Sequence, residues 1–409
     1  MSRLSVVTVA LGALALAAFV ACADSDVSSN GAPPADENDG GTLPPPATPD
    51  GGDADDDTDD AAADPDAAVP ECTREGYCHT VVPKNQTLRG VWSDGAGVTW
   101  AVSEQGAVLR YDGTAWKVHA TLDGALRSIW GSGPTDIWVG GDNGIFHGLG
   151  ASSATITFAP VAIPGPSTPI FSIWGTGPED VWATGNIYSF PILSRVLHYG
   201  VGAPSKDGDA GTLEWSLETV TKAEVLWTRV FGSEASGVWV GGEWFTSNGR
   251  EPLILRRRAG ADTWEEEALP TKPADPSPRG RFKQLFDATA STDGQSMWMV
   301  GNMEGNVPAY AHATSSDGGN TFVWTWGSAG SFGDPYPNAI GATGPNGIYI
   351  AGDYARLRVW NGTRWKQAVI SAGKFPIIAP FYAIGGRADD LWFVGEGVAL
   401  HRVPSKIQP

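Results

Sequence analysis

The chain has 409 residues and a formal net charge of −19, from 46 acidic and 27 basic side chains. Fifteen of the acidic residues lie between residues 23 and 71, which leaves 31 acidic against 27 basic residues elsewhere. With this charge balance the rest of the chain has no excess of basic residues to attract nucleic acids or an anionic membrane surface, so we expect neither as a direct partner.

The chain begins with the pattern of an export signal. Arg3 is the only early charge, and an uninterrupted run of apolar and small residues extends from Leu4 to Val20. That pattern is typical of a signal peptide. The sequence Phe19-Val20-Ala21-Cys22 resembles the lipobox of bacterial lipoproteins. The resemblance implies a signal peptide over 1–22, a lipidated Cys22 and anchoring to the outer membrane or cell surface. Ordinary cleavage, giving a secreted or periplasmic protein, is the alternative, and an uncleaved anchor is a third possibility.

A second segment, residues 23–71, is rich in Asp, Pro, Gly and Ala and has no aromatic residue. It cannot bury enough apolar surface to offset the entropy cost of ordering, so we predict a disordered acidic tether. Its Asp run lacks the spacing of an EF-hand calcium loop. Directly after it, Cys72 and Cys78 are close together in an exported chain, which predicts a local disulfide. A metal site is the weaker interpretation, because only His79 lies near as a further ligand.

One sequence motif, here called the phrase, then occurs seven times. It consists of an apolar run, a Gly-rich turn and a second apolar run that begins with or contains an aromatic residue. The copies begin at Leu88, Leu126, Ile170, Leu226, Phe282, Pro337 and Pro380. Alternation over four to six residues predicts strands, and Asp-Gly and Asn-Gly turns predict hairpins. Four antiparallel strands repeated seven times predict an all-β, seven-bladed β-propeller over residues 72–409. The 18 Trp residues are expected to pack between blades.

The last copy stops short of a fourth strand. The strand-like sequence at 79–82, before the first copy, has no blade of its own. We predict that it supplies the missing outer strand of the last blade and so closes the ring.

A hairpin motif resembles a known family. Ser315, Asp317, Gly319 and Phe322 match the Asp-box of sialidase-like propellers, and 112–116 and 361–365 keep its turn and aromatic residue. In that family the box is structural and lies away from the catalytic face. The strand phrase also resembles repeats of predicted secreted propeller lipoproteins of bacteria.

Three copies combine an Asp before the second-strand aromatic with a His on the third strand. These pairs are Asp136 with His147, Asp180 with His198, and Asp390 with His401. Third strands of different blades are too far apart to share an ion, so we expect no metal and no cofactor. In copies two and seven, where eleven residues separate the Asp from the His, a hairpin would place the two directly across from each other. We expect the Asp–His pairs to form structural hydrogen bonds inside their blades.

No catalytic residue can be assigned from the sequence. It has no G-x-S-x-G, H-E-x-x-H or phosphate-loop motif. Arg256, Arg257 and Arg258 follow one another on one strand, where neighbours point to opposite faces, which favours an ordinary charged strand. A sialidase-like site would need three converging Arg residues and a Tyr nucleophile.

Long loops predict a ligand face. Second-to-third strand loops and blade-to-blade connections emerge on one face of a propeller, and they carry aromatic residues. These are Tyr188, Phe190, Trp244, Phe245, Phe332, Tyr336 and Phe375. The predicted function is non-catalytic binding of a polysaccharide, peptidoglycan or a protein partner by a monomer. The alternatives are a sialidase-like glycoside hydrolase or other propeller enzyme, and a scaffold protein of an envelope complex.

Overall fold

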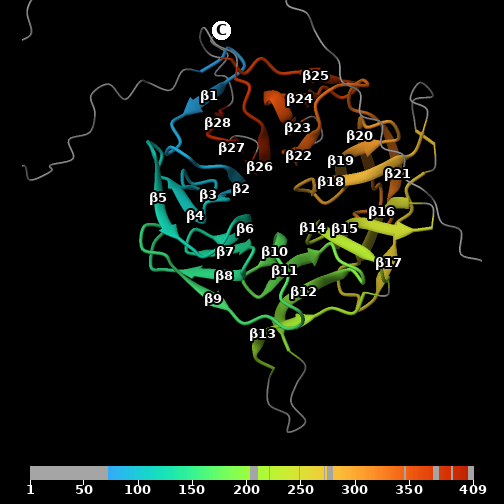
Figure 1. Ribbon diagram of the computed structural model, residues 1–409, viewed down its shortest axis with the longest axis horizontal. Coiled ribbons are helices and arrows are strands. Elements are labelled where there is room, and N and C mark those ends of the chain that lie inside the picture. The colour runs from blue at the N-terminus through green and yellow to red at the C-terminus, as the bar shows by residue number, and fades with distance from the viewer. Residues whose placement is uncertain are drawn as a thin grey trace, which may run out of the picture. The chain divides into compact units, whose positions relative to one another are not determined.

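The computed structural model describes residues 72–202, 211–220, 222–247, 249–270, 272–273, 280–344, 347–371, 377–387 and 390–403. The expected signal peptide, Cys22 and the acidic tether lie outside these residues. The described residues form seven four-stranded antiparallel sheets arranged as blades around a central axis (Figure 1). This arrangement confirms the seven-bladed β-propeller. The one helix among the described residues is the short 3₁₀ element η1, Asp353–Ala355.

The first four blades are continuous in sequence, and each runs from the axis outward. Blade 1 is β2 (Leu88–Ser93), β3 (Thr99–Ser103), β4 (Ala107–Tyr111) and β5 (Trp116–Thr121). Blade 2 is β6 (Leu126–Gly133), β7 (Asp136–Gly141), β8 (Gly144–Leu149) and β9 (Thr157–Val161). Blade 3 is β10 (Ile170–Gly177), β11 (Asp180–Ile187), β12 (Leu193–Val201) and β13 (Leu213–Leu217). Blade 4 is β14 (Val225–Ser233), β15 (Gly237–Thr246), β16 (Gly249–Arg257) and β17 (Trp264–Glu266).

The last three blades follow the same plan, except that blade 7 takes its outer strand from the N-terminal side. Blade 5 is β18 (Phe282–Ala290), β19 (Ser296–Met303), β20 (Val307–Thr314) and β21 (Val323–Ser328). Blade 6 is β22 (Pro337–Ala342), β23 (Ile348–Gly352), β24 (Leu357–Trp360) and β25 (Trp365–Gln367). Blade 7 is β26 (Phe381–Arg387), β27 (Asp390–Gly395), β28 (Ala399–Arg402) and β1 (Tyr77–Thr80).

The ring closes through β1, which pairs with β28 in the register Tyr77 to Arg402. This confirms closure by a strand that precedes the first copy. The strand begins two residues earlier than expected from the sequence. The reason is that Tyr77 fills the core between blades 6 and 7, whereas Val81 is exposed. Closure in this way covers the edge that β28 would otherwise present to solvent.

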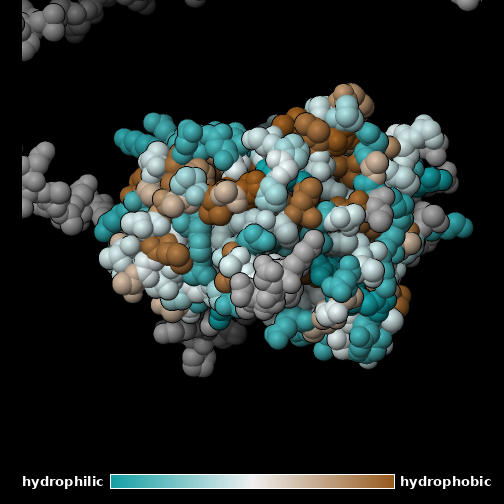
Figure 2. Space-filling model, turned by 90° about the horizontal axis from the view of Figure 1, so that it is seen from below, coloured by the Kyte–Doolittle hydropathy of each residue, from teal (hydrophilic) through white to brown (hydrophobic). Residues whose placement is uncertain are grey.

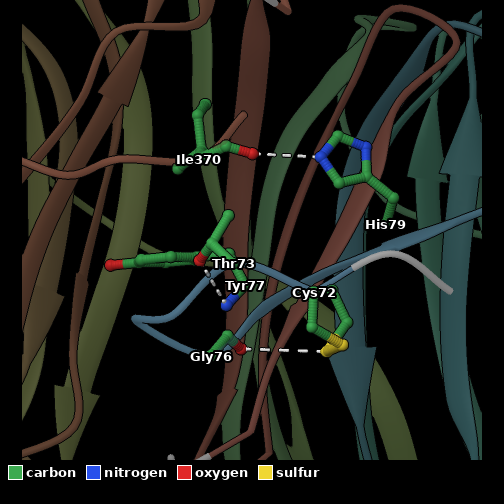
Figure 3. Close-up of a disulfide and its surroundings, with 7 residues drawn as sticks. Cys72, Thr73, Gly76, Tyr77, His79 and Ile370 are labelled. Atoms are coloured by element: carbon green, nitrogen blue, oxygen red, sulfur yellow. Dashed lines mark hydrogen bonds between the residues drawn. A yellow bond between two sulfur atoms is a disulfide. The ribbon is translucent and has the colours of Figure 1, made fainter. Parts of the chain in front are cut away.

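A disulfide links Cys72 to Cys78, the second residue of this closing strand (Figure 3), as the Cys spacing predicts. Within the closed loop the Tyr77 backbone N–H donates to Thr73 Oγ1 over 3.2 Å. Beyond it, His79 Nε2 lies 3.0 Å from the carbonyl oxygen of Ile370, in the segment after blade 6 (Figure 3). The start of the propeller is therefore tied to both of its last two blades.

Neighbouring blades pack through tryptophan and glycine, which explains why both recur in the phrase. The six-membered ring of Trp92 lies against Gly131 of the next blade, and Trp130 lies likewise against Gly175. A Cβ at either glycine would approach the indole to 2.8 Å, closer than van der Waals contact allows. The Trp residues of the second strands, such as Trp138 and Trp298, are almost fully buried.

The side view in Figure 2 shows hydrophobic residues in separate patches among hydrophilic ones. Among the described residues, no helix has the length and hydropathy needed to cross a bilayer.

Candidate ligand site at the channel mouth

Each innermost strand carries a β-bulge near its start. In the register with the second strand, every blade has an unpaired residue three positions before the residue that faces the second-strand Trp or Tyr, and β18 has a further unpaired residue, Lys283. A bulge of this kind bends the strand and redirects the extra side chain. From blade 1 to blade 7 these residues are Arg89, Arg127, Phe171, Thr228, Phe286, Asn338 and Tyr382. We call them the mouth ring.

All seven mouth-ring residues are half-buried and line one cavity of about 390 Å³ on the axis. We call it the mouth cavity. Its further lining residues are Arg229, Glu243 and Leu285. The innermost strands start at the blade-to-blade connections, so the mouth cavity opens on that face, here named the connection face. The opposite face, which holds the turns between first and second strands, is the turn face. A second cavity of about 220 Å³ continues along the axis, and Arg89, Arg127 and Arg229 line both cavities.

Three guanidinium groups converge on these cavities, each held by a carboxylate. Arg89 Nε lies 2.8 Å from Glu104 Oε1, and Arg127 Nε lies 2.7 Å from Asp142 Oδ1. Both carboxylates belong to the second-to-third strand turns of the same blades and line neither cavity. They fix the direction of the guanidinium groups from the rim side.

The third arginine belongs to blade 4 and pairs across to blade 5. Arg229 Nε lies 2.7 Å from Asp287 Oδ1, while Asp287 Oδ2 accepts the backbone N–H of Ile340 over 2.9 Å. One carboxylate thereby joins the innermost strands of three successive blades. Counting both cavities, three guanidinium groups face two carboxylates, those of Asp287 and Glu243.

Aromatic rings stand beside the arginines. The Arg89 guanidinium lies 3.7 Å from the ring centre of Tyr382, and that of Arg127 lies 5.0 Å from Phe171. These are cation–π distances. Phe286 meets Tyr336 edge to face, with centroids 6.2 Å apart. The mouth cavity therefore combines positive charge with apolar surface, a composition that suits a ligand with both characters.

A buried acid links the mouth cavity to the loops of blades 3 and 4. Burial raises the pKa of Glu243, although its ion pair with Arg250, at 3.1 Å, opposes that shift. The same Arg250 guanidinium lies 5.0 Å from the ring of Phe245 and 5.5 Å from that of Tyr188. Tyr188 also meets Phe190, with centroids 5.6 Å apart.

The structure thus brings together part of the expected ligand face. Tyr188, Phe190 and Phe245 form one aromatic cluster around Arg250, and Phe190 is 77% exposed. Tyr336 reaches the mouth cavity separately, through Phe286.

The remaining expected face residues do not join this cluster. Phe332 is 84% exposed on the connection between β21 and β22. Trp244 is half-buried against the core of blades 3 and 4, with the Lys222 ammonium 4.5 Å above its ring. Phe375 lies outside the described residues.

The Asp and His residues of three blades lie within hydrogen-bonding distance, but not directly across from each other. His147 Nε2 is 2.6 Å from Asp136 Oδ1, and the distances from His198 to Asp180 and from His401 to Asp390 are both 2.8 Å. The residue opposite each His is the second-strand Trp, on which the imidazole stacks. The expected register was therefore wrong by two residues, because a tight turn pairs Gly141 with Gly144.

These carboxylates share a common electrostatic pattern. Burial would raise the pKa of Asp136, but the hydrogen bonds from His147 and Ser132 lower it below the usual value. The pKa of Asp180 is lowered in the same way by His198 and Thr176. His198 has a second acid, since its Nδ1 lies 3.5 Å from Glu218 Oε1. Within the described residues, no group of three or more His, Cys, Asp or Glu is arranged to hold a metal ion.

The hairpin that matches the Asp-box lies on the turn face of blade 5. Asp317 Oδ1 accepts the backbone N–H groups of Asn320 and Thr321 over 3.0 and 2.9 Å, and Ser315 Oγ accepts that of Gly319 over 2.8 Å. Phe322 meets Trp239 edge to face. These contacts hold the turn and supply no group to the channel.

Arg256 departs from the expectation of an ordinary charged strand. It is buried opposite Trp239 in blade 4, and its guanidinium donates to the carbonyl oxygens of Ser236, Gly319 and Asn320. It thereby fastens the hairpin of blade 5 to blade 4. Alternation alone could not show that a neighbouring blade provides two of the three acceptors.

Sequence reasoning missed the mouth ring. The sequence did contain a signal for it. In several copies the residue directly after the first apolar residue of the innermost strand differs in chemistry from copy to copy, whereas its neighbours repeat. Arg89, Arg127 and Tyr382 all occupy that position. Arg229 sits one residue later, so only the strand register shows that it reaches the same cavity.

No protein-family model and no curated protein sequence matches the chain. Solved structures do. A YCF48 structure bound to D1 peptide aligns with a TM-score of 0.56 at 17% identity, over 84% of this chain and 99% of that one. A streptogramin B lyase gives 0.54 at 15% identity, over 79% and 95%. The WD40 β-propeller domain of Doa1 gives 0.52 at 15% identity, over 80% and 97%. At these identities the likeness shows the fold alone: the chain is a β-propeller protein.

Proposed function

We propose that this protein is a non-catalytic binding protein that holds a peptide segment of a partner protein in the mouth cavity. One observation carries the proposal. The fold redirects one side chain per blade into the cavity, and these seven positions hold five different residue types while the surrounding strands repeat. A position that served only the repeat would hold the same kind of residue in every blade.

The lining indicates the chemistry of the peptide. Three guanidinium groups line the two cavities, and the carboxylates that pair with Arg89 and Arg127 lie outside the lining, so a ligand in the cavities meets the N–H donors of these arginines. Arg127 and Arg89 offer bidentate partners to a carboxylate. Phe171, Phe286 and Tyr382 provide surface for an apolar side chain. The proposed ligand is an acidic peptide with an apolar residue near its carboxylate. The YCF48 structure with D1 peptide supports this choice, because a propeller of similar fold was solved with a peptide.

The test begins with selection of peptides from a random phage library on the purified protein. Affinities of the selected peptides are then measured by fluorescence anisotropy. Arg127→Ala should weaken binding about tenfold or more, as expected for a central arginine anchor. Asp142→Ala is the matched control, since it removes the same ion pair but keeps the cation, and binding should persist. Arg364→Ala, an exposed arginine on the outer turn of blade 6, should change nothing. Unchanged affinity in both Arg127→Ala and Tyr382→Ala would contradict the site.

Location at the cell envelope is part of the proposal. The lipobox-like sequence at Cys22 supports lipid anchoring, and the Cys72–Cys78 disulfide is consistent with an oxidising compartment. The acidic segment 23–71 would then separate the propeller from the membrane. Fractionation of cells that express the wild type and Cys22→Ala tests this. The wild type should sediment with membranes, and the variant should be found in a soluble fraction or remain as an uncleaved precursor.

A sialidase-like glycosidase is the second candidate, because three arginines reach the axis on the connection face. One observation favours binding over this reaction. Burial raises the pKa of the Tyr382 phenol, which disfavours the phenolate that a nucleophile needs. Hydrolysis of sialyllactose by the wild type, lost in both Arg127→Ala and Tyr382→Phe, would support the glycosidase instead.

A further inference from the structure

The turn face has its own cavity, at the opposite end of the channel. It measures about 620 Å³ and is lined by the ends of the innermost strands and the turns that follow them. We call it the turn-face bowl. Three of its lining residues are Trp92, Trp130 and Trp174, from the successive blades 1, 2 and 3. In the other blades the equivalent positions hold Phe231, Thr289, Gly341 and Gly385. The aromatic wall is therefore confined to one side of the bowl.

These three tryptophans differ from the Trp residues of the second strands. They are half-buried, whereas Trp100, Trp138 and Trp182 are almost fully buried. One part of each indole ring packs against a glycine of the next blade. The indole N–H groups take no part in this packing, since they form no hydrogen bond with any described residue and are not buried. Each N–H is a donor that an incoming ligand can use.

Hydroxyl groups surround the tryptophans. Ser132 Oγ donates to Asp136 Oδ2 over 2.5 Å, and Thr176 Oγ1 donates to Asp180 Oδ2. Because these hydroxyl protons are already used, the oxygen lone pairs are what the two residues can offer to a ligand. Ser233 and Thr292 add further hydroxyls to the lining.

Among the described residues, the charged side chains that line the bowl are two acids and one base, Asp94, Glu234 and Arg387. This distribution opposes an anionic ligand, in contrast to the mouth cavity. Flat aromatic surface, free N–H donors and hydroxyl acceptors around a shallow space match the alternation of C–H faces and hydroxyl groups in a pyranose.

We propose that the turn-face bowl is a binding site for a neutral oligosaccharide, which stacks on Trp92, Trp130 and Trp174. The site is distinct from the mouth cavity and does not depend on peptide binding there. The protein would then hold a glycan and a protein segment on opposite faces of one propeller.

The test uses the indole N–H signals of the ¹⁵N-labelled protein, with neutral tetrasaccharides of glucose, N-acetylglucosamine, mannose and galactose as probes. Three signals, assigned by Trp92→Phe, Trp130→Phe and Trp174→Phe, should shift together on addition of at least one probe. Trp130→Phe keeps an aromatic ring against Gly175 but removes the N–H donor, and should weaken binding about tenfold. Trp365→Phe, a half-buried Trp in the outer strand of blade 6, is the matched control and should bind normally.

Two results would overturn the proposal. In the first, none of the four tetrasaccharides shifts the three indole signals. In the second, Trp130→Phe and Trp174→Phe each bind the probe with wild-type affinity, and the indole signals that remain in each variant shift as in the wild type. Arg127→Ala serves as a separate reference and should bind the tetrasaccharide like the wild type, so failure at one face is distinguishable from failure at the other.

Discussion

The imidazole of His147 stacks on the indole of Trp138, its direct cross-strand partner, with ring centroids 3.6 Å apart and planes 10° from parallel. The same relation recurs between Trp182 and His198 in blade 3 and between Trp298 and His312 in blade 5. In these blades the Trp orients the ring, so the residue two positions before the Trp decides whether the His has a carboxylate partner. Blade 2 has Asp136 there and blade 5 has Ser296.

Removing the carboxylate in blade 2 should destabilise the fold. Asp136→Ala leaves the half-buried His147 and Ser132 without a common acceptor, so the free energy of unfolding should fall by about 1–3 kcal/mol. Urea denaturation followed by tryptophan fluorescence measures this change. Asp262→Ala, at a nearly fully exposed side chain, should stay within about 0.5 kcal/mol of the wild type. Equal midpoints for Asp136→Ala and the wild type would reject a structural role for the pair.

Adding the missing carboxylate in blade 5 should have the opposite effect. The imidazole of His312 is stacked on Trp298, but its buried Nε2 has no partner among the described residues. Ser296→Asp places an acid where Asp136 stands in blade 2, so the pKa of His312 should rise from about 4 toward or above 6.5. Two-dimensional NMR titration of the histidine ring protons measures it. Ser296→Asn is the neutral control and should leave the pKa low.

The pKa values of two histidines should be shifted in opposite directions from 6.5 in the native protein. Burial alone would lower the pKa of His198, but Asp180 and Glu218 raise it above 6.5, whereas burial lowers the pKa of His312 to about 4. Glu218→Gln should lower the pKa of His198 and leave that of His312 unchanged. The same titration experiment tests both statements, and a His198 value below 6.5 in the wild type would contradict the first.

These pKa values have consequences for stability that differ in sign. For His312, the unfolded chain binds the proton more tightly, so its contribution is complete above pH 6.5 and falls as pH drops toward 4, by at most about 1.4 kcal/mol per pH unit. For His198, the folded state binds the proton more tightly, so its contribution is complete below pH 6.5 and is lost as pH rises through the folded value. Comparing wild-type and His312→Gln stabilities between pH 4 and 7 isolates the first effect, since the difference should grow with pH.

Closure of the ring should depend more on packing than on the disulfide. Tyr77→Ala removes a side chain that is 2% exposed and packs on Phe393, so the loss should be about 3 kcal/mol or more. The disulfide closes a short loop, for which chain entropy predicts about 2 kcal/mol on reduction. Thermal unfolding with and without reductant compares the two. A larger effect of reduction than of Tyr77→Ala would show that the disulfide, rather than the core contact, holds β1.

Much of the fold could be predicted because its signals are local. Strand alternation, the Asp-Gly and Asn-Gly turns and the repeat length are properties of adjacent residues, and the short last copy indicated closure by an N-terminal strand. The mouth ring could not be predicted in this way. A bulge adds one unpaired residue within one strand of a pair, so the register shifts by one and Arg127 turns into the channel although its neighbours keep the repeat.

Long-range contacts account for the other differences. Arg256 is buried because the hairpin of blade 5 brings the carbonyl oxygens of Gly319 and Asn320 onto blade 4, and no pattern within blade 4 encodes that neighbour. The closing strand begins two residues earlier than expected, because the side chain of Tyr77 packs in the core between blades 6 and 7.

By itself, the sequence determined the number of blades, the order of the strands, the closing strand and the disulfide, since each follows from spacing along the chain. The tertiary structure alone decided which side chains meet at the axis. Arg89, Arg127 and Arg229 come from three different blades, and only closure of the ring, together with the bulges that turn these side chains inward, brings their guanidinium groups into one cavity.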